Sequence, residues 1–462
     1  MTEHLIDNKS HAKQVEELDK KHYLHPTTIP KKHVDHGPKL TFSNGHGIYV
    51  HDTKKDTYID GISMLWNVNL GHGQKELADA AHHQMSTLAY SSSFAGYSNE
   101  PAVLLAEKLA ALAPGDLNAV FYTSGGSESN DTAFKLSRFY WQLKNQPQKT
   151  KIIALEQSYH GVTIAGQSAT HLAAFHNFAG SSINGVLHAK PHLTECEKGS
   201  TSHPEYEGCI RHIVEKEGAD TIAAVIIEPV QGSGGVHMPP AGYMEAVRDL
   251  CNEFNIHMIA DEIICGFGRT GKMFGVDHWN VVPDIMCTAK GITSGYSQLG
   301  AVLLHQNIRD TLVQYEEVLA HGFTYSGHPT ACAVALKNLE IMERDQIVDH
   351  TKTMEKHLLQ GLGYLKEKHS MVGKTRALGL LGGFEIFADS EKEIEFDPSL
   401  TAAAALTEEC FARKLILRPL GAGVGKNIIA IAPPLIITKD EIEKMISIID
   451  DSLSALSKKL KA

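Results

Sequence analysis

The chain has 462 residues, of which 42% are hydrophobic and 21% charged, the proportions of an ordinary globular protein of two or three domains. Its formal net charge of -11 argues against nucleic acid as a partner, because the phosphate backbone is also negative. No run of about 18 apolar residues occurs, and residues 1–19 are acidic without an apolar stretch, so neither a membrane span nor a signal peptide is predicted. We therefore expect a cytoplasmic protein.

The first 60 residues predict an N-terminal helix and then short strands, because Ile48, Val50 and Ile59 alternate with polar residues after a turn at residues 45–47. Beyond them, short apolar runs alternate with longer helical patterns, which is typical of βα units around a mostly parallel sheet. Helices are predicted at residues 101–112, 127–144 and 242–254, and strands at residues 119–123, 152–155, 223–227, 257–260, 285–288 and 301–304.

The C-terminal part reads differently from this α/β region. Long helices are predicted at residues 329–344 and 354–368, strands near residues 378–387 and 415–418, and a closing helix at residues 440–459. We expect both ends of the chain to form a smaller α+β domain beside the large sheet domain. The expected division is an N-terminal segment at residues 1–60, a large domain at residues 61–330 and a C-terminal part at residues 331–462.

The seven cysteines are scattered, which fits reduced thiols better than a disulfide framework. One cluster, His192, Cys196, His203, Cys209 and His212, raises the alternative of a zinc site. It has no C-x-x-C pair and no closely spaced pair of histidines of the usual kind, and 27 histidines make chance neighbours common. We expect a polar surface insertion there and predict no metal site.

Polar and glycine residues follow the predicted strands at the point where each strand ends. In an open α/β sheet, ligands bind at the carboxyl ends of the strands, so these residues should share one edge. The turn Ser124-Gly125-Gly126 leads directly into a helix and offers backbone N–H groups to an anion. The residues after the next four strands include an aromatic ring, two carboxylates and an amine: Tyr159, Glu228, Asp261 and Lys290.

Each of these groups has a role if the ligand is a phosphorylated pyridine aldehyde. The glycine turn would hold the phosphate, and Tyr159 would stack on the ring. A carboxylate such as Asp261 keeps the ring nitrogen protonated, so that the ring withdraws electrons. Lys290 would supply the amine for a Schiff base and then move a proton, helped by a pKa lowered by burial. Each signal is weak alone, and their order along successive strands gives them weight.

A competing motif is the run from Gly266 to Gly271, which satisfies G-x-G-x-x-G. A P-loop fails because Met273 stands where a magnesium-binding Ser or Thr is needed. A dinucleotide site requires the run to open a helix, but no helical periodicity follows it. We interpret the run as a glycine-rich loop; an NAD-dependent oxidoreductase, the alternative from another class, would depend on this motif alone.

Longer blocks of sequence carry a resemblance to a known family. They are WNVNLGHG at residues 66–73, SESND at 127–131, YHGVT at 159–163, EPVQG at 228–232, ADEIICGFGRTG at 260–271, AKGITSGY at 289–296 and FTYSGHP at 323–329. From about residue 35 to its end, the chain resembles the class III aminotransferases, and within them the omega-amino-acid or amine:pyruvate transaminases. The resemblance implies a fold-type I homodimer, or a pair of dimers, with active sites at the subunit interface and pyridoxal 5'-phosphate as the cofactor.

The resemblance also assigns roles to single residues. Lys290 forms the Schiff base, Asp261 pairs with the pyridine nitrogen, and Ile263 packs on the ring face opposite Tyr159. The remaining cofactor residues are Ser124, Gly125 and Gly126 at the phosphate, Thr324 at the phosphate of the neighbouring subunit's cofactor, and His160 and Glu228 near the ring. The family's cradle usually reads Gly-Ser-Gly, so the order Ser-Gly-Gly leaves open which hydroxyl contacts the phosphate.

For the substrate, the resemblance points to Arg418, Trp66 and Phe94. Arg418 resembles an arginine that swings to bind a keto-acid carboxylate and away to admit an amine, although a salt bridge between domains is an alternative role. Trp66 and Phe94 match positions that line the substrate pocket, and Phe94 could equally be core. The expected reaction is ping-pong transfer of an amino group from an omega-amino acid, primary amine or taurine to pyruvate. The diaminopelargonate-type and acetylornithine-type aminotransferases are the nearest alternatives.

Overall fold

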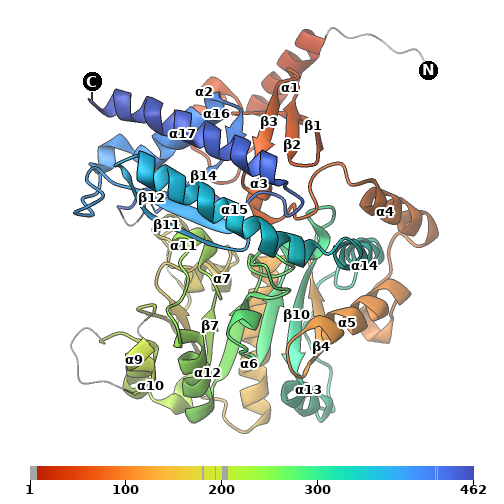
Figure 1. The fold of residues 1–462 in the computed structure, drawn as a ribbon. Coiled ribbons are helices and arrows are strands. Elements are labelled where there is room, and N and C mark those ends of the chain that lie inside the picture. Colours follow the sequence, from red (N-terminus) through yellow and green to blue (C-terminus); the bar gives the residue numbers. More distant parts are fainter. Residues whose placement is uncertain are drawn as a thin grey trace.

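The computed structural model describes residues 8–178, 180, 182–192, 194–199, 207–421, 423 and 425–461. Its centre is a seven-stranded sheet of order β4-β10-β9-β8-β7-β5-β6 (Figure 1). Every pairing in it is parallel except those of β10, which is antiparallel to both neighbours. The strands are β4 (Leu117–Thr123), β5 (Lys151–Leu155), β6 (Val186–Ala189), β7 (Ile222–Ile227), β8 (His257–Asp261), β9 (Ile285–Thr288) and β10 (Gly300–His305).

Both faces of this sheet are covered, which is why its strands are continuous apolar runs. In β7 all six residues are buried, and alternate side chains enter different cores, Val225 with one and Ile226 with the other. The helix α6 (Gly126–Leu143) contributes Phe134 to the core that holds Ile226, and α12 (Tyr243–Glu253) contributes Val247 to the core that holds Val225. The two helices therefore lie on opposite faces of the sheet.

Two smaller four-stranded sheets are built from the ends of the chain. In one, of order β1-β2-β3-β13, the C-terminal β13 (Leu415–Ile416) runs parallel to β3 (Thr57–Asp60) beside β1 (Phe42–His46) and β2 (Tyr49–Asp52). The other, of order β11-β12-β15-β14, contains β11 (Val372–Leu378), β12 (Leu381–Ile386), β15 (Ile428–Ile431) and β14 (Arg418–Leu420). The single strand predicted at residues 415–418 is therefore wrong, because the chain changes sheets at Leu417.

The helices outside the central layer cover its sides and the smaller sheets, with α15 and α17 packed on each other (Figure 1). The predicted helix at residues 354–368 begins seven residues earlier, at Ile347, and β6 was not predicted. No helix in the described part of the chain is long and apolar enough to cross a membrane. The α-helices not yet given are α1 (Asn8–His22), α2 (Pro30–His36), α3 (Ser63–Trp66), α4 (Lys75–Thr87), α5 (Glu100–Leu112), α7 (Ile164–Ala169), α8 (Ala173–His176), α9 (Thr194–Glu197), α10 (Ile210–Glu217), α11 (Gly232–Gly235), α13 (Gln306–Val313), α14 (Pro329–Arg344), α15 (Ile347–Lys368), α16 (Ala402–Ala412) and α17 (Lys439–Lys461).

The expectation of reduced cysteines is wrong for one pair. Cys196 in α9 and Cys209 at the start of α10 form a disulfide, with their Cα atoms 6.6 Å apart. The two short helices pack together as an insertion beside α12, which brings these two side chains within bonding distance. His203, from the same sequence cluster, lies outside the described residues. The other five cysteines are buried thiols: Cys251, Cys265, Cys287, Cys332 and Cys410.

Candidate active site

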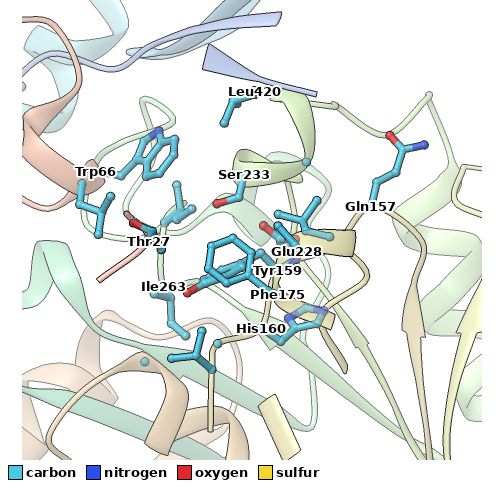
Figure 2. Close-up of a pocket in the computed structure, with 18 of the residues that line it drawn as sticks. Thr27, Trp66, Gln157, Tyr159, His160, Phe175, Glu228, Ser233, Ile263 and Leu420 are labelled. Carbon is cyan, nitrogen blue, oxygen red and sulfur yellow. Dashed lines mark hydrogen bonds between the residues drawn. The ribbon is translucent and has the colours of Figure 1, made fainter. Parts of the chain in front are cut away.

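A cavity of about 560 Å³ opens at the carboxyl ends of the central strands. Three of its lining residues follow parallel neighbouring strands: Glu228 after β7, Asp261 at the end of β8 and Lys290 after β9. Figure 2 shows Trp66 and Leu420 on one side of the cavity and His160 and Ile263 on the other. Its volume lies in the range of sites that enclose a small molecule and its cofactor.

Three hydrogen bonds fix the Asp261 carboxylate. Its Oδ2 accepts from Nδ1 of His160 at 2.8 Å and from Nδ2 of Asn130 at 2.8 Å, and its Oδ1 accepts from the N–H of Ile263 at 3.2 Å. His160 and Asn130 are almost fully buried, so both donors are held rigidly by packing. The carboxylate therefore has one fixed orientation in the cavity, and Asn130, on α6, is a positioning residue that sequence reasoning did not single out.

Lys290 has a positive φ of 49° at the start of a 3-10 turn, Lys290–Thr293. A side chain other than glycine in this conformation costs about 1–2 kcal/mol, and such backbone strain is concentrated at functional sites. Burial lowers the pKa of the Lys290 ammonium to about 8, against the opposing effect of the Asp261 and Glu228 carboxylates. A far larger share of this amine is neutral at physiological pH than for an exposed lysine, and a neutral amine is a nucleophile.

Glu228 positions the aromatic side of the cavity. It is 5% exposed, and its oxygens accept from the N–H groups of Tyr159 at 2.9 Å and Gly232 at 3.1 Å. Burial raises the pKa of its carboxyl to about 7, although the charge of His160 acts in the opposite direction. The Tyr159 ring meets Phe175 edge-on, with centroids 5.3 Å apart. Glu228 thus holds the backbone of Tyr159 while Phe175 supports its ring.

The N-terminus of α6 brings Gly126 and Ser127 to the cavity. Gly125 is the N-cap and makes no side-chain cap, and Gly126 and Ser127, the first two residues of the helix, line the cavity. The first N–H groups of a helix have no partner within it and can bind an anion. A Cβ on Gly126 would lie 2.8 Å from Ile263, so the close approach of helix and side chain requires glycine. Ser124 and Gly125 do not line the cavity, and the N–H of Ser124 already donates to Glu128 at 2.8 Å.

Besides Ser124 and Gly125, two further predicted site residues, Phe94 and Thr324, lie outside the cavity of this single chain. Phe94 is 52% exposed and its ring packs near Gly322. Thr324 is also exposed, and its carbonyl accepts from the hydroxyl of Tyr90 at 2.9 Å. Both residues therefore lie where segments 90–94 and 322–324 meet at the surface. A contribution of one subunit to the other's site would come from this surface.

Other lining residues come from segments that carry no sequence signal. Pro26 and Thr27 reach the cavity from the loop between α1 and α2, and Phe175 and Ser233 come from α8 and α11 (Figure 2). Neither a motif nor a periodicity marks these positions, because they are brought to the site by tertiary packing of loops and one-turn helices.

Arg418 enters the cavity from β14, on the small sheet. Its guanidinium carbon lies 5.2 Å from the centroid of Trp66, and Nζ of Lys290 lies 5.7 Å from the same centroid. Burial lowers the pKa of Arg418, and among the described residues no carboxylate lies within ion-pair distance of it. The alternative of a salt bridge between domains therefore has no partner in the described chain. Trp66 itself is 2% exposed.

The glycine-rich loop is hydrogen-bonded to other parts of the same chain. The run Gly266–Gly271 does not open an α-helix, as predicted; bends and a short 3-10 helix, Gly275–His278, follow it. Arg269 within the run is fully buried. Its guanidinium donates to the carbonyls of Leu380 and Pro433, to the hydroxyl of Ser63 and to the side chain of Asn69. Burial lowers the pKa of Arg269 to about 9. The loop therefore ties three distant parts of the chain together beside the cavity.

Comparison with known proteins decides the family. The model of the family "Aminotransferase class-III" matches residues 31–453. The chain belongs to the class III aminotransferases. It is 36% identical over 435 residues to the putrescine–pyruvate aminotransferase of Pseudomonas aeruginosa, covering 93% of this chain and 94% of the relative. It is 33% identical over 448 residues to the diaminobutyrate–2-oxoglutarate transaminase of Halomonas elongata, covering 94% of each.

A solved structure agrees over nearly the whole length. The transaminase from the marine bacterium Virgibacillus is 44% identical, with a TM-score of 0.93, and the match covers 97% of this chain and 100% of that one. The expected fold-type I architecture is thereby confirmed. Class III aminotransferases use pyridoxal 5'-phosphate. The cavity fits this cofactor because it combines the uncapped N-terminus of α6, a fixed carboxylate and an amine of lowered pKa.

Proposed function

We propose that this class III aminotransferase takes its amino group from a primary amine, an omega-amino acid or taurine and gives it to a keto acid with one carboxylate, pyruvate first among them. The observation that carries the proposal is Arg418, a half-buried cation without a carboxylate partner in the described chain. Desolvating a charge is costly unless a counter-ion replaces the lost water. A guanidinium binds a carboxylate or sulfonate through two parallel hydrogen bonds, so an anionic substrate would satisfy it.

The lining of the cavity supports a keto acid with a single carboxylate. Arg418 and Lys290 are the two Lys or Arg side chains among the lining residues of the described chain. With Lys290 engaged at the cofactor, one cation is left for the substrate, whereas 2-oxoglutarate carries two carboxylates. The apolar side chains Leu65, Phe175 and Leu420 complete the wall and suit the carbon chain of an amine.

The other site residues receive roles under the same proposal. The bound cofactor supplies an aldehyde and an electron-withdrawing ring that makes the C–H bond beside the amine acidic. Lys290 holds the cofactor covalently and, once displaced, its neutral amine moves the proton. Asp261, fixed by His160 and Asn130, keeps the proton on the ring nitrogen. Other residues complete the cofactor shell: Gly126 and Ser127, with Ser124 and Gly125 behind them, at the phosphate; Tyr159 and Ile263 at the ring; Glu228 behind Tyr159.

Exposed apolar residues support a homodimer that completes the site. Phe94 and Tyr97 are 52% and 71% exposed, and Val318 and Tyr325 are 83% and 58% exposed. The two segments adjoin, because Tyr90 and Tyr325 have ring centroids 6.2 Å apart. An apolar surface of this kind is typical of a subunit interface. We propose that Thr324 and Phe94 act from it on the cavity of the partner subunit.

The test is a panel of amino donors, assayed with pyruvate and with 2-oxoglutarate as acceptors. We expect turnover with primary amines or omega-amino compounds and pyruvate, and none in Lys290→Ala, which removes the only proposed covalent link to the cofactor. A strong preference for 2-oxoglutarate would overturn the proposed acceptor while leaving the family assignment intact. Mass measurement by light scattering tests the dimer separately.

A further inference from the structure

Three side chains with metal-binding atoms meet in the N-terminal segment, away from the cofactor site. Asp19 lies on α1, His33 on α2 and His25 in the loop that connects the two helices. Nε2 of His25 lies 3.0 and 2.9 Å from the two oxygens of Asp19, and Nε2 of His33 lies 2.8 Å from Oδ1 of Asp19. One atom from each residue lies within 4.8 Å of the others. Three potential ligand atoms thus converge on one point.

Hydrogen bonding accounts for the contact of His25 with Asp19 but not for that of His33. His33 is 9% exposed, its Nε2 is buried, and this atom has no hydrogen-bond partner in the described chain despite its short distance to Asp19. A buried ring nitrogen is normally satisfied, because an unpaired polar atom loses its hydration without compensation. Nε2 of His33 thus lies close to Asp19 without the geometry of a hydrogen bond, and an ion bound to both atoms would satisfy it.

We infer that Asp19, His25 and His33 form a binding site for a divalent transition-metal ion, with zinc as the best-fitting probe. Two imidazole nitrogens and one carboxylate oxygen are a donor set that zinc takes readily, with water in the fourth position. Zinc lies about 2.0–2.1 Å from such ligands, so tetrahedral ligand atoms stand roughly 3.3 Å apart. The separations of 2.8 to 3.0 Å between Asp19 and each histidine need to widen by only a few tenths of an ångström.

The site has a direct connection to the active-site cavity. His25 is followed by Pro26 and Thr27, which line that cavity, and Figure 2 shows Thr27 at its edge near Trp66. The loop buries little of its own apolar surface, since Leu24 is 77% exposed. An ion bound to Asp19, His25 and His33 joins α1, the loop and α2, so it fixes Thr27 at the cavity wall. The proposed metal binding is independent of the proposed function. Only an effect of the metal on turnover would rest on that function.

The experiment uses the cofactor-loaded enzyme after removal of metal by a chelator. Zinc is titrated and the bound metal is counted after gel filtration, and cobalt is bound in parallel because its visible spectrum reports imidazole ligands outside the cofactor band. The variants are His33→Asn and Asp19→Asn, and the matched control is His36→Asn, an exposed histidine on the same helix. Retained cofactor absorbance shows that each variant is folded.

We expect one zinc ion per chain in the wild type and in His36→Asn, and binding at least about 100-fold weaker in His33→Asn and Asp19→Asn, as for loss of a ligand. Zinc should also slow tryptic cleavage at Lys20 and Lys32 in the wild type but not in His33→Asn. Equal zinc binding by wild type and His33→Asn, or no cobalt spectrum in the wild type, would overturn the site. Transaminase activity does not enter these readouts, so failure of the proposed function would leave the metal result standing.

Discussion

Replacing Arg418 by alanine tests the proposed substrate anchor most directly. A hydrogen bond to a charged group contributes about 1.5–3 kcal/mol, and a carboxylate would receive two from the guanidinium. Because the cavity is open to solvent at one side, we take the lower end of this range for each of the two hydrogen bonds, about 3 kcal/mol in total. This free energy corresponds to roughly a 150-fold loss of kcat/KM for pyruvate. The guanidinium has no ion-pair partner to release in the described chain, so the fold should be little affected.

The assay separates the two halves of the reaction. The half-reaction with pyruvate should fall by this factor in Arg418→Ala, while the half-reaction with a simple amine changes by no more than about threefold, because an amine does not contact the guanidinium. Arg418→Lys keeps the charge but loses the planar fork, and we expect an intermediate loss of about tenfold. An equal fall in both halves would refute the reasoning, because it would mean that Arg418 shapes the cavity and does not bind the acceptor.

Three further outcomes are expected. The rate at which the cofactor-free protein captures pyridoxal phosphate should rise about tenfold per pH unit up to the Lys290 pKa of about 8 and then level off. The reason is that burial lowers this pKa and only the neutral amine reacts. A rate that does not change with pH below pH 8 would contradict this. Asp261→Asn keeps the shape held by His160 but not the charge, so turnover should fall about 10²–10³-fold at an unchanged melting temperature, and retention of full activity would remove its assigned role. Gly379→Ala places a Cβ 2.3 Å from the backbone of Thr270, at a φ of +58° that disfavours alanine. Urea unfolding should therefore show a free energy of unfolding lower by about 2–4 kcal/mol. In the control Gly363→Ala, which has open space around it in α15, stability should be unchanged or higher.

The strand-end residues were predictable because two simple rules combine. Apolar runs such as 223–227 and 257–260 identify buried strands, and parallel packing brings the residues after them to one edge. Both strands are present, and Glu228, Asp261 and Lys290 meet in one cavity. Their catalytic roles stay predictions, as does the division of the chain at residues 60 and 330.

What the sequence did not reveal depends on contacts between distant segments. β6 has half-buried residues with little alternation, and it pairs only at the edge of the sheet. The disulfide of Cys196 required α9 and α10 to pack against each other, which spacing alone does not encode. Thr27 reaches the cavity through a loop. That Ser127 lines the cavity and Ser124 does not depends on where α6 begins. Each of these features depends on how distant segments pack, and a change of a few residues in one loop or helix end would alter it.

The parallel pairing of β3 with β13 has a consequence for how the enzyme is made. Residues 57–60 complete their sheet only with residues 415–416, and Arg269 needs the carbonyl of Pro433. During synthesis on the ribosome, residues 415–416 are made about 355 residues after residue 60. Contacts this distant in sequence slow folding, because long loops must close first. A chain truncated before β13 would therefore reach neither a closed N-terminal sheet nor a cavity with Arg418, and a competent cofactor pocket should arise only after the segment from β13 to Pro433 has been made.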